Sequence, residues 1–301
     1  MTQVVDISTD NGYARPRDPV ELWLARCWQE VLGFGVGIRE NFFGIGGNSL
    51  DAARVVNAVL DELHVQLPLN VVTEHPTVER LAARLRDEDT SALAVPLQEI
   101  QSGDGTRPPL FMVHPDDGEA GPYCHLARAL GEEFAVFGLQ AVGLYTDAEP
   151  LGTVAAMARA YVEEIRTVEP AGPYLLGGCA TGAAVAYEMA CQLVDAGAEV
   201  RLLAAVDTEL VEPHADRPPR DETPEFVARS SRVSRANRDA TRAWRPRPYP
   251  GPLDLFGEPA GTRPPAVDWS VAGDRRVHEC GAAADGTHVR ELARVLRELI
   301  G

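Results

Sequence analysis

The stretch from Asn41 to Leu50, NFFGIGGNSL, places a single serine at the end of a glycine-rich loop. Glycines adopt positive φ without steric cost, so they let the chain turn sharply just before Ser49. The residues that follow, up to Val56, have apolar side chains at helical spacing, and the N-terminus of such a helix is partly positive. A phosphate ester on Ser49 would be stabilised there. For an isolated Gly-Gly-x-Ser, the alternative is an ordinary serine N-cap without further chemistry.

Helical patterns flank this loop on both sides. Residues 18–33 predict an amphipathic helix, and residues 67–85 predict a short helix followed by one that begins after a proline. This order of elements around the serine loop closely resembles a peptidyl carrier protein of nonribosomal peptide synthetases. The resemblance implies an all-α four-helix carrier bundle in which Ser49 carries a covalent 4′-phosphopantetheine arm.

Composition restricts the remaining possibilities. A length of 301 residues suits two domains, and a net charge of -17 argues against nucleic acid or an anionic membrane as a partner. The five cysteines are odd in number and scattered, which fits reduced thiols of a cytoplasmic protein better than a disulfide framework. The cysteines lack the spacing of a zinc site, no apolar segment is long enough to span a membrane, and the N-terminus has no signal core.

From residue 108 onward, short apolar runs alternate with helical patterns, which predicts a mostly parallel sheet with helices on both faces. Residues 212–247 interrupt this alternation with a segment rich in Arg, Asp and Pro, and a helix is expected near 224–243. Such an insertion is either a lid over the site or a surface excursion without a gating role. The expected organisation is a disordered tail (1–17), the carrier (18–88), a linker (89–95) and the second domain (96–301).

The second domain resembles a type I thioesterase of nonribosomal peptide and polyketide assembly lines, over nearly all of residues 95–301. The resemblance rests on residues 109–115, 174–188, 206–207, 249–253 and 288–293. It implies an α/β-hydrolase fold with a serine nucleophile in Gly-x-Ser-x-Gly, on a strand-to-helix elbow. The matching segment here is Gly178-Cys179-Ala180-Thr181-Gly182, so Ala180 stands at the nucleophile position. A methyl group cannot attack a thioester.

The same resemblance assigns the other catalytic positions. Asp207 matches the acid of the triad, and the backbone amides of Asp116 and Thr181 match the oxyanion hole. The histidine loop is shorter than in the family: His288 aligns with the first residue of the last helix, and Ala283 falls nearer the catalytic place. His288 is therefore the candidate base only if it turns toward Asp207.

Three alternatives concern side chains close to these positions. A one-residue shift of the elbow would make Cys179 the nucleophile, whereas in the family register Cys179 is a small buried side chain. His278 falls on an expected strand and is interpreted as structural. Asp116 and Asp117 replace small residues of the family, and their carboxylates would oppose a developing oxyanion.

These observations favour one function and leave a second open. The favoured function is a carrier of an aminoacyl or peptidyl thioester, fused to a natural thioesterase-like domain that holds the loaded arm or recruits another enzyme. Its partners would be a phosphopantetheinyl transferase and either adenylation and condensation domains or a trans-acting tailoring enzyme. The alternative is a terminal thioesterase, for hydrolysis or macrocyclisation, in which Ala180 replaces the serine to trap the acyl-carrier state. Three features depart from the family together: the nucleophile, the histidine loop and the small residues of the oxyanion loop. Their joint loss favours the natural thioesterase-like domain over the trapped thioesterase. A free-standing esterase is disfavoured because the carrier motif is complete.

Overall fold

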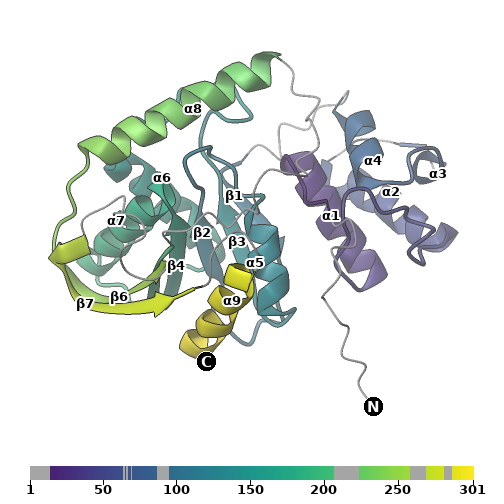
Figure 1. Cartoon of the computed structure of the whole chain (residues 1–301). Coiled ribbons are helices and arrows are strands. Elements are labelled where there is room, and N and C mark those ends of the chain that lie inside the picture. The colour runs from purple at the N-terminus through teal and green to yellow at the C-terminus, as the bar shows by residue number, and fades with distance from the viewer. Residues whose placement is uncertain are drawn as a thin grey trace. The chain divides into compact units, whose positions relative to one another are not determined.

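The chain folds into two compact units, Met1–Leu93 and Ala94–Gly301. In the described residues the first unit contains only helices, and the second combines helices with a sheet (Figure 1). The expected tail and linker lie almost entirely outside the described residues. The computed structural model describes residues 14–63, 65, 67–68, 70–86, 95–206, 224–257, 269–280 and 287–301.

The first unit is the expected four-helix bundle. Asp18 caps the first helix by accepting a hydrogen bond from the amide of Glu21, and Gly33, with φ +82°, ends it. The apolar faces of the helices share one core, in which Trp28 packs edge-on against Phe42 with ring centroids 4.7 Å apart. The helices are α1 (Pro19–Leu32), α2 (Ser49–Leu63), α3 (Val71–Glu74) and α4 (Val78–Leu85).

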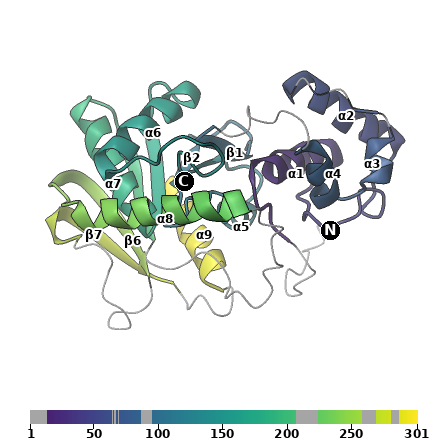
Figure 2. The same ribbon diagram turned by 90° about the horizontal axis from the view of Figure 1, so that it is seen from above.

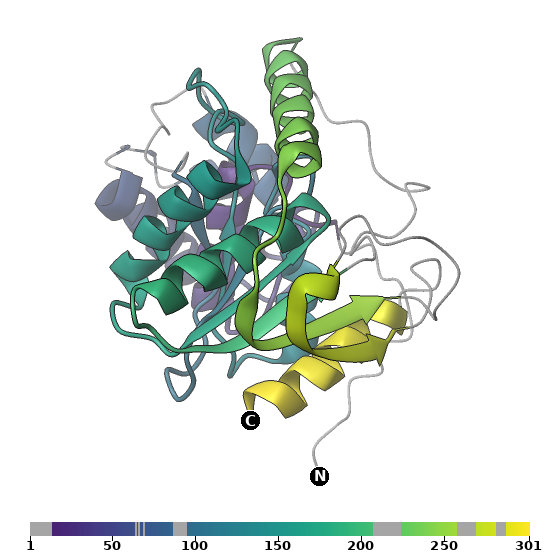
Figure 3. The ribbon, with the colours of Figure 1, turned by 90° about the vertical axis from the view of Figure 1, so that its left-hand side faces the viewer.

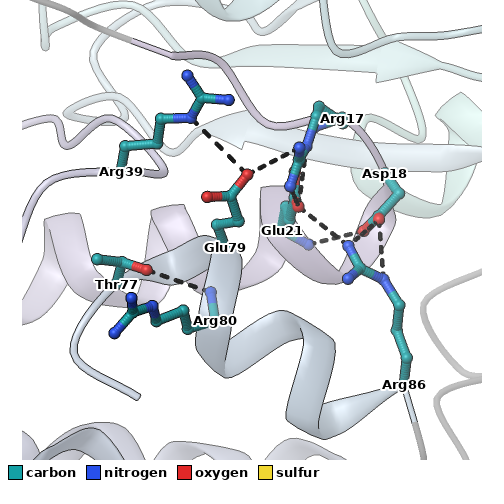
Figure 4. Close-up of polar contacts among 8 residues, drawn as sticks. All are labelled: Arg17, Asp18, Glu21, Arg39, Thr77, Glu79, Arg80 and Arg86. Carbon is teal, nitrogen blue, oxygen red and sulfur yellow. Dashed lines mark hydrogen bonds and ion pairs between the residues drawn. The ribbon is translucent and has the colours of Figure 1, made fainter. Parts of the chain in front are cut away.

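A network of charged side chains joins α1 to both ends of α4 (Figure 4). The carboxylate of Glu21 is fully buried and accepts hydrogen bonds from Arg17 at 2.5 Å and from Arg86 at 3.0 Å. Arg17 also pairs with Glu79 at 2.9 Å, and Arg86 pairs with Asp18. Because each buried charge has an opposite partner, the network fixes how α1 and α4 pack.

The second unit contains the expected, mostly parallel sheet. Among the described residues the strand order is β1-β3-β2-β4-β5-β6-β7, and every neighbouring pair is parallel except the edge strand β1 with β3. The strands are β1 (Leu97–Gln101), β2 (Leu110–Val113), β3 (Val136–Leu139), β4 (Tyr174–Cys179), β5 (Val200–Val206), β6 (Tyr249–Gly257) and β7 (Ala272–Glu279), with a 3-10 turn, η3 (Trp269–Val271), before β7.

Helices cover both faces of this sheet, as the alternating pattern predicts (Figures 1 and 2). One face carries α6 (Val154–Val168) and α7 (Thr181–Asp195), and the other carries α5 (Tyr123–Leu130) and α9 (Thr287–Ile300). The α/β prediction is therefore confirmed. Within the described part of the chain, no helix has both the length and the apolar character needed to cross a membrane.

The helix α8 (Pro224–Ala243) forms the insertion between β5 and β6 and stands apart from the two helical layers (Figure 3). Its side chains contact the residues that follow β2 and the first residue of α7 after β4. It therefore lies over the carboxyl ends of these two strands, where ligands bind in open α/β sheets.

Candidate functional site

Ser49 is exposed and is the first residue of α2, but it does not cap that helix. The side-chain oxygen of Asn48 accepts hydrogen bonds from the amides of Leu50 at 2.8 Å and Asp51 at 3.2 Å. Asp51 in turn accepts one from the Asn48 amide at 3.3 Å. This reciprocal arrangement is a capping box. The simple serine N-cap is therefore wrong here, and the hydroxyl of Ser49 is left for other chemistry.

The loop before Ser49 is fixed by its glycines. Gly46 has φ +110°, and a Cβ on Gly47 would lie 2.5 Å from the buried ring of Phe42. Only glycine therefore allows the loop to close over Phe42 and deliver the serine to the start of α2. An exposed hydroxyl at a helix N-terminus is the setting that a phosphate ester requires, so Ser49 fits a covalent phosphopantetheine.

In the second unit, Ala180 occupies the sharp corner between β4 and α7. Among the described residues it alone has positive φ without being glycine, with φ 50° and ψ −118°. A Cβ on Gly178 would overlap the main chain of Gly182, and a Cβ on Gly182 would overlap the carbonyl oxygen of Val113. The two glycines therefore allow the strand and helix to approach, which is the geometry of a nucleophile elbow with Ala180 at its corner.

The geometry argues against the shifted register in which Cys179 is the nucleophile. Cys179 is the last residue of β4, and its side chain is buried. Burial raises the pKa of its thiol to about 12, so the reactive thiolate is scarce at neutral pH. Cys179 is a packed core residue next to the elbow.

The structure brings Asp116 and Thr181 together in an unexpected way. One carboxylate oxygen of Asp116 accepts hydrogen bonds from the amide of Thr181 at 3.2 Å and from its hydroxyl at 2.6 Å. The carboxylate thus does more than lie near the expected oxyanion hole: it bonds to the amide that the family uses as a donor.

Two side chains of α8 complete this cluster, and the sequence did not single them out. Asn237 is buried and donates a hydrogen bond to the main-chain oxygen of Asp116 at 3.0 Å. The hydroxyl oxygen of Thr241 lies 3.0 Å from that of Thr181. Their spacing was the one sequence feature that could have indicated this. The two residues lie four positions apart in an otherwise Arg-rich segment, so they share one face of the helix.

Apolar contacts add to these bonds between α8 and the loops beneath it. Val233 of α8 packs with Ala141 and Leu144, which follow β3. Gly118 has φ +86°, and a Cβ there would lie 2.7 Å from Val233. The loop after β2 therefore fits closely beneath α8 at Gly118.

Comparison with known proteins assigns both units. A phosphopantetheine attachment site model matches residues 22–85, and a thioesterase domain model matches residues 108–257. The chain joins a phosphopantetheine-binding carrier domain to a thioesterase domain. This carrier type is the site where 4′-phosphopantetheine is attached covalently.

The related proteins are nonribosomal peptide synthetases and thioesterases. The chain is 41% identical over 194 residues to a dimodular nonribosomal peptide synthase of Bacillus subtilis (strain 168), covering 64% of this chain and 8% of that protein. A solved four-domain nonribosomal peptide synthetase, holo-AB3403 bound to AMP and glycine, shares the fold with TM-score 0.74 and 22% identity, covering 97% of this chain and 27% of that one. The NocB thioesterase domain, in complex with a fluorophosphonate nocardicin G analogue, has TM-score 0.56 and 29% identity, covering 68% and 99% of the two chains.

The other expected triad positions of the thioesterase domain follow β5 and begin α9. Asp207 and Ala283 lie outside the described residues, although β5 ends at Val206, directly before Asp207. His288 lies in the first turn of α9, and its side chain is only 1% exposed. The structure thus brings Ala180, Thr181 and Asp116 together and leaves the roles of His288 and Asp207 as predictions.

Two further histidines of the thioesterase domain have structural partners. Burial lowers the pKa of His114 to about 4, and its ring nitrogens contact the Pro115 carbonyl at 2.8 Å and the Tyr161 hydroxyl at 2.9 Å. His278 lies 2.8 Å from the buried carboxylate of Asp254, in agreement with its structural interpretation. The described residues contain no cluster of His, Cys, Asp and Glu suited to a metal ion.

Proposed function

We propose that this chain carries an aminoacyl or peptidyl group on phosphopantetheine in nonribosomal peptide biosynthesis, and that its thioesterase domain holds that group or recruits an enzyme to it. The observation that carries the proposal is Ala180 at the corner of the elbow. The domain keeps the fold and the strained turn of a hydrolase, yet the side chain at the corner has no oxygen or sulfur with which to attack.

The attachment point in this proposal is Ser49. Its exposure, its place at the start of α2 and the transfer of capping to Asn48 support this role. When bound, the arm supplies a terminal thiol that holds the acyl group as a thioester. A phosphopantetheinyl transferase would install it, and other synthetase domains or a tailoring enzyme would act on the tethered group.

The loss of hydrolysis follows from the way triads work. Nucleophile, base and acid act as a unit, so removing the serine alone lowers turnover by a factor on the order of 10⁶ in a serine protease. With Ala180 at the elbow, hydrolysis of a tethered thioester should fall by a comparable factor. A domain that binds an acyl chain without cleaving it can shelter the thioester or present it to a second enzyme.

The attachment role is tested by mass. Incubation with a phosphopantetheinyl transferase and coenzyme A should add one phosphopantetheine to the full chain and none to Ser49→Ala. An unmodified wild-type protein, or modification that persists in Ser49→Ala, would overturn the assignment.

The non-hydrolytic role is tested by Ala180→Ser, with a small acyl thioester as substrate. The proposal expects turnover near background in both proteins. A rise of several powers of ten in Ala180→Ser that is abolished by adding His288→Ala would instead support the alternative, a hydrolytic or cyclising thioesterase in which Ala180 stands in for the serine.

A further inference from the structure

The first amide of α7 already has an acceptor. Ala180, at the N-cap position, has no side chain that can bond to the free amides of the first turn. Asp116, 65 positions earlier in the chain, accepts from the amide of Thr181 instead. In an α/β-hydrolase, the amide that follows the nucleophile is one of the two oxyanion donors.

We propose that the carboxylate of Asp116 closes the oxyanion hole of the thioesterase domain from within. The inference deepens the proposed non-hydrolytic function and rests on it for its biological meaning. The domain would then be disabled twice, because the elbow lacks a nucleophile and the donor needed to polarise a thioester carbonyl is taken.

Distance and charge both support this closure. An oxyanion donor must lie about 2.7–3.1 Å from the oxygen that it stabilises. The Asp116 oxygen lies 3.2 Å from the Thr181 nitrogen, just outside that range, so a carbonyl oxygen could not approach the amide without displacing the carboxylate. A carboxylate at this point would also repel the negative charge that develops on an attacked carbonyl. The partly positive N-terminus of α7 favours the carboxylate in that position.

The carboxylate is also held in position. The Thr181 hydroxyl donates to the same oxygen at 2.6 Å, and this side chain is only 2% exposed. Asn237 anchors the main chain of Asp116 from α8, and Thr241 contacts the Thr181 hydroxyl. Freeing the Thr181 amide from the carboxylate would therefore require breaking contacts made by both α7 and α8.

The test introduces a thiol at the elbow, in the full-length apo chain, through Ala180→Cys. A thiolate needs no general base, so the test does not depend on His288 or Asp207. Two reactions are timed on the same thiol. With iodoacetamide, the S–C bond forms as the C–I bond breaks and iodide leaves, and no oxyanion develops. With p-nitrophenyl acetate, the sulfur adds to the carbonyl, an oxyanion forms, and p-nitrophenolate leaves.

The native thiols interfere little with this measurement. All five cysteines are buried. Burial raises the pKa values of Cys27, Cys179 and Cys191 to about 12 and that of Cys280 to about 11. Ala180 is only half-buried, so the introduced thiol is more accessible, and mass spectrometry of the labelled peptide assigns each reaction to its site.

The informative quantity is the ratio of the acylation rate to the alkylation rate. Adding Asp116→Ala should raise this ratio at least about tenfold, since one oxyanion donor contributes on the order of 10²–10³ in rate in a serine protease. Asp104→Ala is the matched control and should leave the ratio unchanged, because the Asp104 carboxylate lies in the turn before β2 and bonds to the amide and hydroxyl of Thr106. An unchanged ratio in Asp116→Ala, with equal effects on both reactions, would overturn the proposal.

A second variant keeps the test decisive if Asp116→Ala impairs folding. Asp116→Ser replaces the carboxylate with a short uncharged side chain, like the small residues expected of the family at this position, so the ratio should again rise. Circular dichroism establishes that each variant is folded. A folded Asp116→Ser with the parent ratio would also count against the closure. Neither result bears on the loading of Ser49, so this proposal can fail while the proposed function stands.

Discussion

Replacing Ala180 with glycine should stabilise the thioesterase domain, although the same change in a helix destabilises proteins. The backbone at Ala180 has φ 50° and ψ −118°, a conformation that residues other than glycine rarely adopt. Holding a non-glycine residue there costs about 1–3 kcal/mol. Glycine removes that strain but loses about 0.5–1 kcal/mol through its greater freedom in the unfolded chain. The net expectation is a gain of about 1 kcal/mol.

The matched control is Ala183→Gly, three residues further along α7. Ala183 is buried and lies within the helix, so glycine should cost about 1 kcal/mol there. The assay is differential scanning calorimetry of the full chain, following the transition of the larger unit, Ala94–Gly301. A change of 1 kcal/mol shifts the Tm of a domain of this size by about 2–4 °C. We expect Ala180→Gly to raise the Tm and Ala183→Gly to lower it.

A lower Tm for both variants would refute the reasoning. It would mean that the elbow imposes no strain that a Cβ must bear, and that Ala180 contributes to α7 as an ordinary first-turn residue. A higher Tm for Ala180→Gly would show that the strained elbow conformation at Ala180 lowers the stability of the domain, although no nucleophile occupies that corner.

Three further predictions concern other parts of the structure. Asn48→Ala should lower the free energy of unfolding of the carrier by about 1 kcal/mol through loss of the cap, measured in urea, while mass spectrometry still finds phosphopantetheine on Ser49. Gly182→Ala should abolish the thermal transition of the thioesterase domain, because its Cβ would overlap a main-chain oxygen, whereas Gly152→Ala, with no atom within 4 Å of its Cβ, should not. Cys179 should resist iodoacetamide at pH 8 in the native protein. Burial raises the pKa of the Cys179 thiol to about 12, above the value of about 8.5 in an unfolded chain. The neutral thiol therefore contributes its full share to the free energy of unfolding below about pH 8.5. That contribution is lost as the pH rises toward 12.

Much of the architecture was predictable because it follows from local patterns. The glycines around Ala180 fix a strand-to-helix corner by their spacing, and the apolar runs identify buried strands, so both the fold and the place of that corner followed from the sequence. The start of α2 was harder to assign. Asn48 and Ser49 are both good capping residues. The structure shows that Asn48 caps the helix, because its side-chain oxygen accepts from the amides of Leu50 and Asp51.

The contact between Asp116 and Thr181 could not be predicted in the same way. The sequence showed that acidic residues replace small ones in the oxyanion loop, which gave the sign of the electrostatic effect. Whether the carboxylate points to solvent or to the amide depends on how the loop is held by α8, through Asn237. That information is tertiary and has no periodic signature.

The capping of α2 by Asn48 has a consequence for how the carrier can be used repeatedly. Since the helix does not depend on the Ser49 hydroxyl, esterifying that oxygen removes none of the capping bonds that hold the first turn. Installing the arm, or removing it, should therefore carry no folding penalty at this helix. The carrier domain would keep the same scaffold through every cycle, and an enzyme that distinguishes a loaded carrier from an empty one must recognise the arm and its cargo.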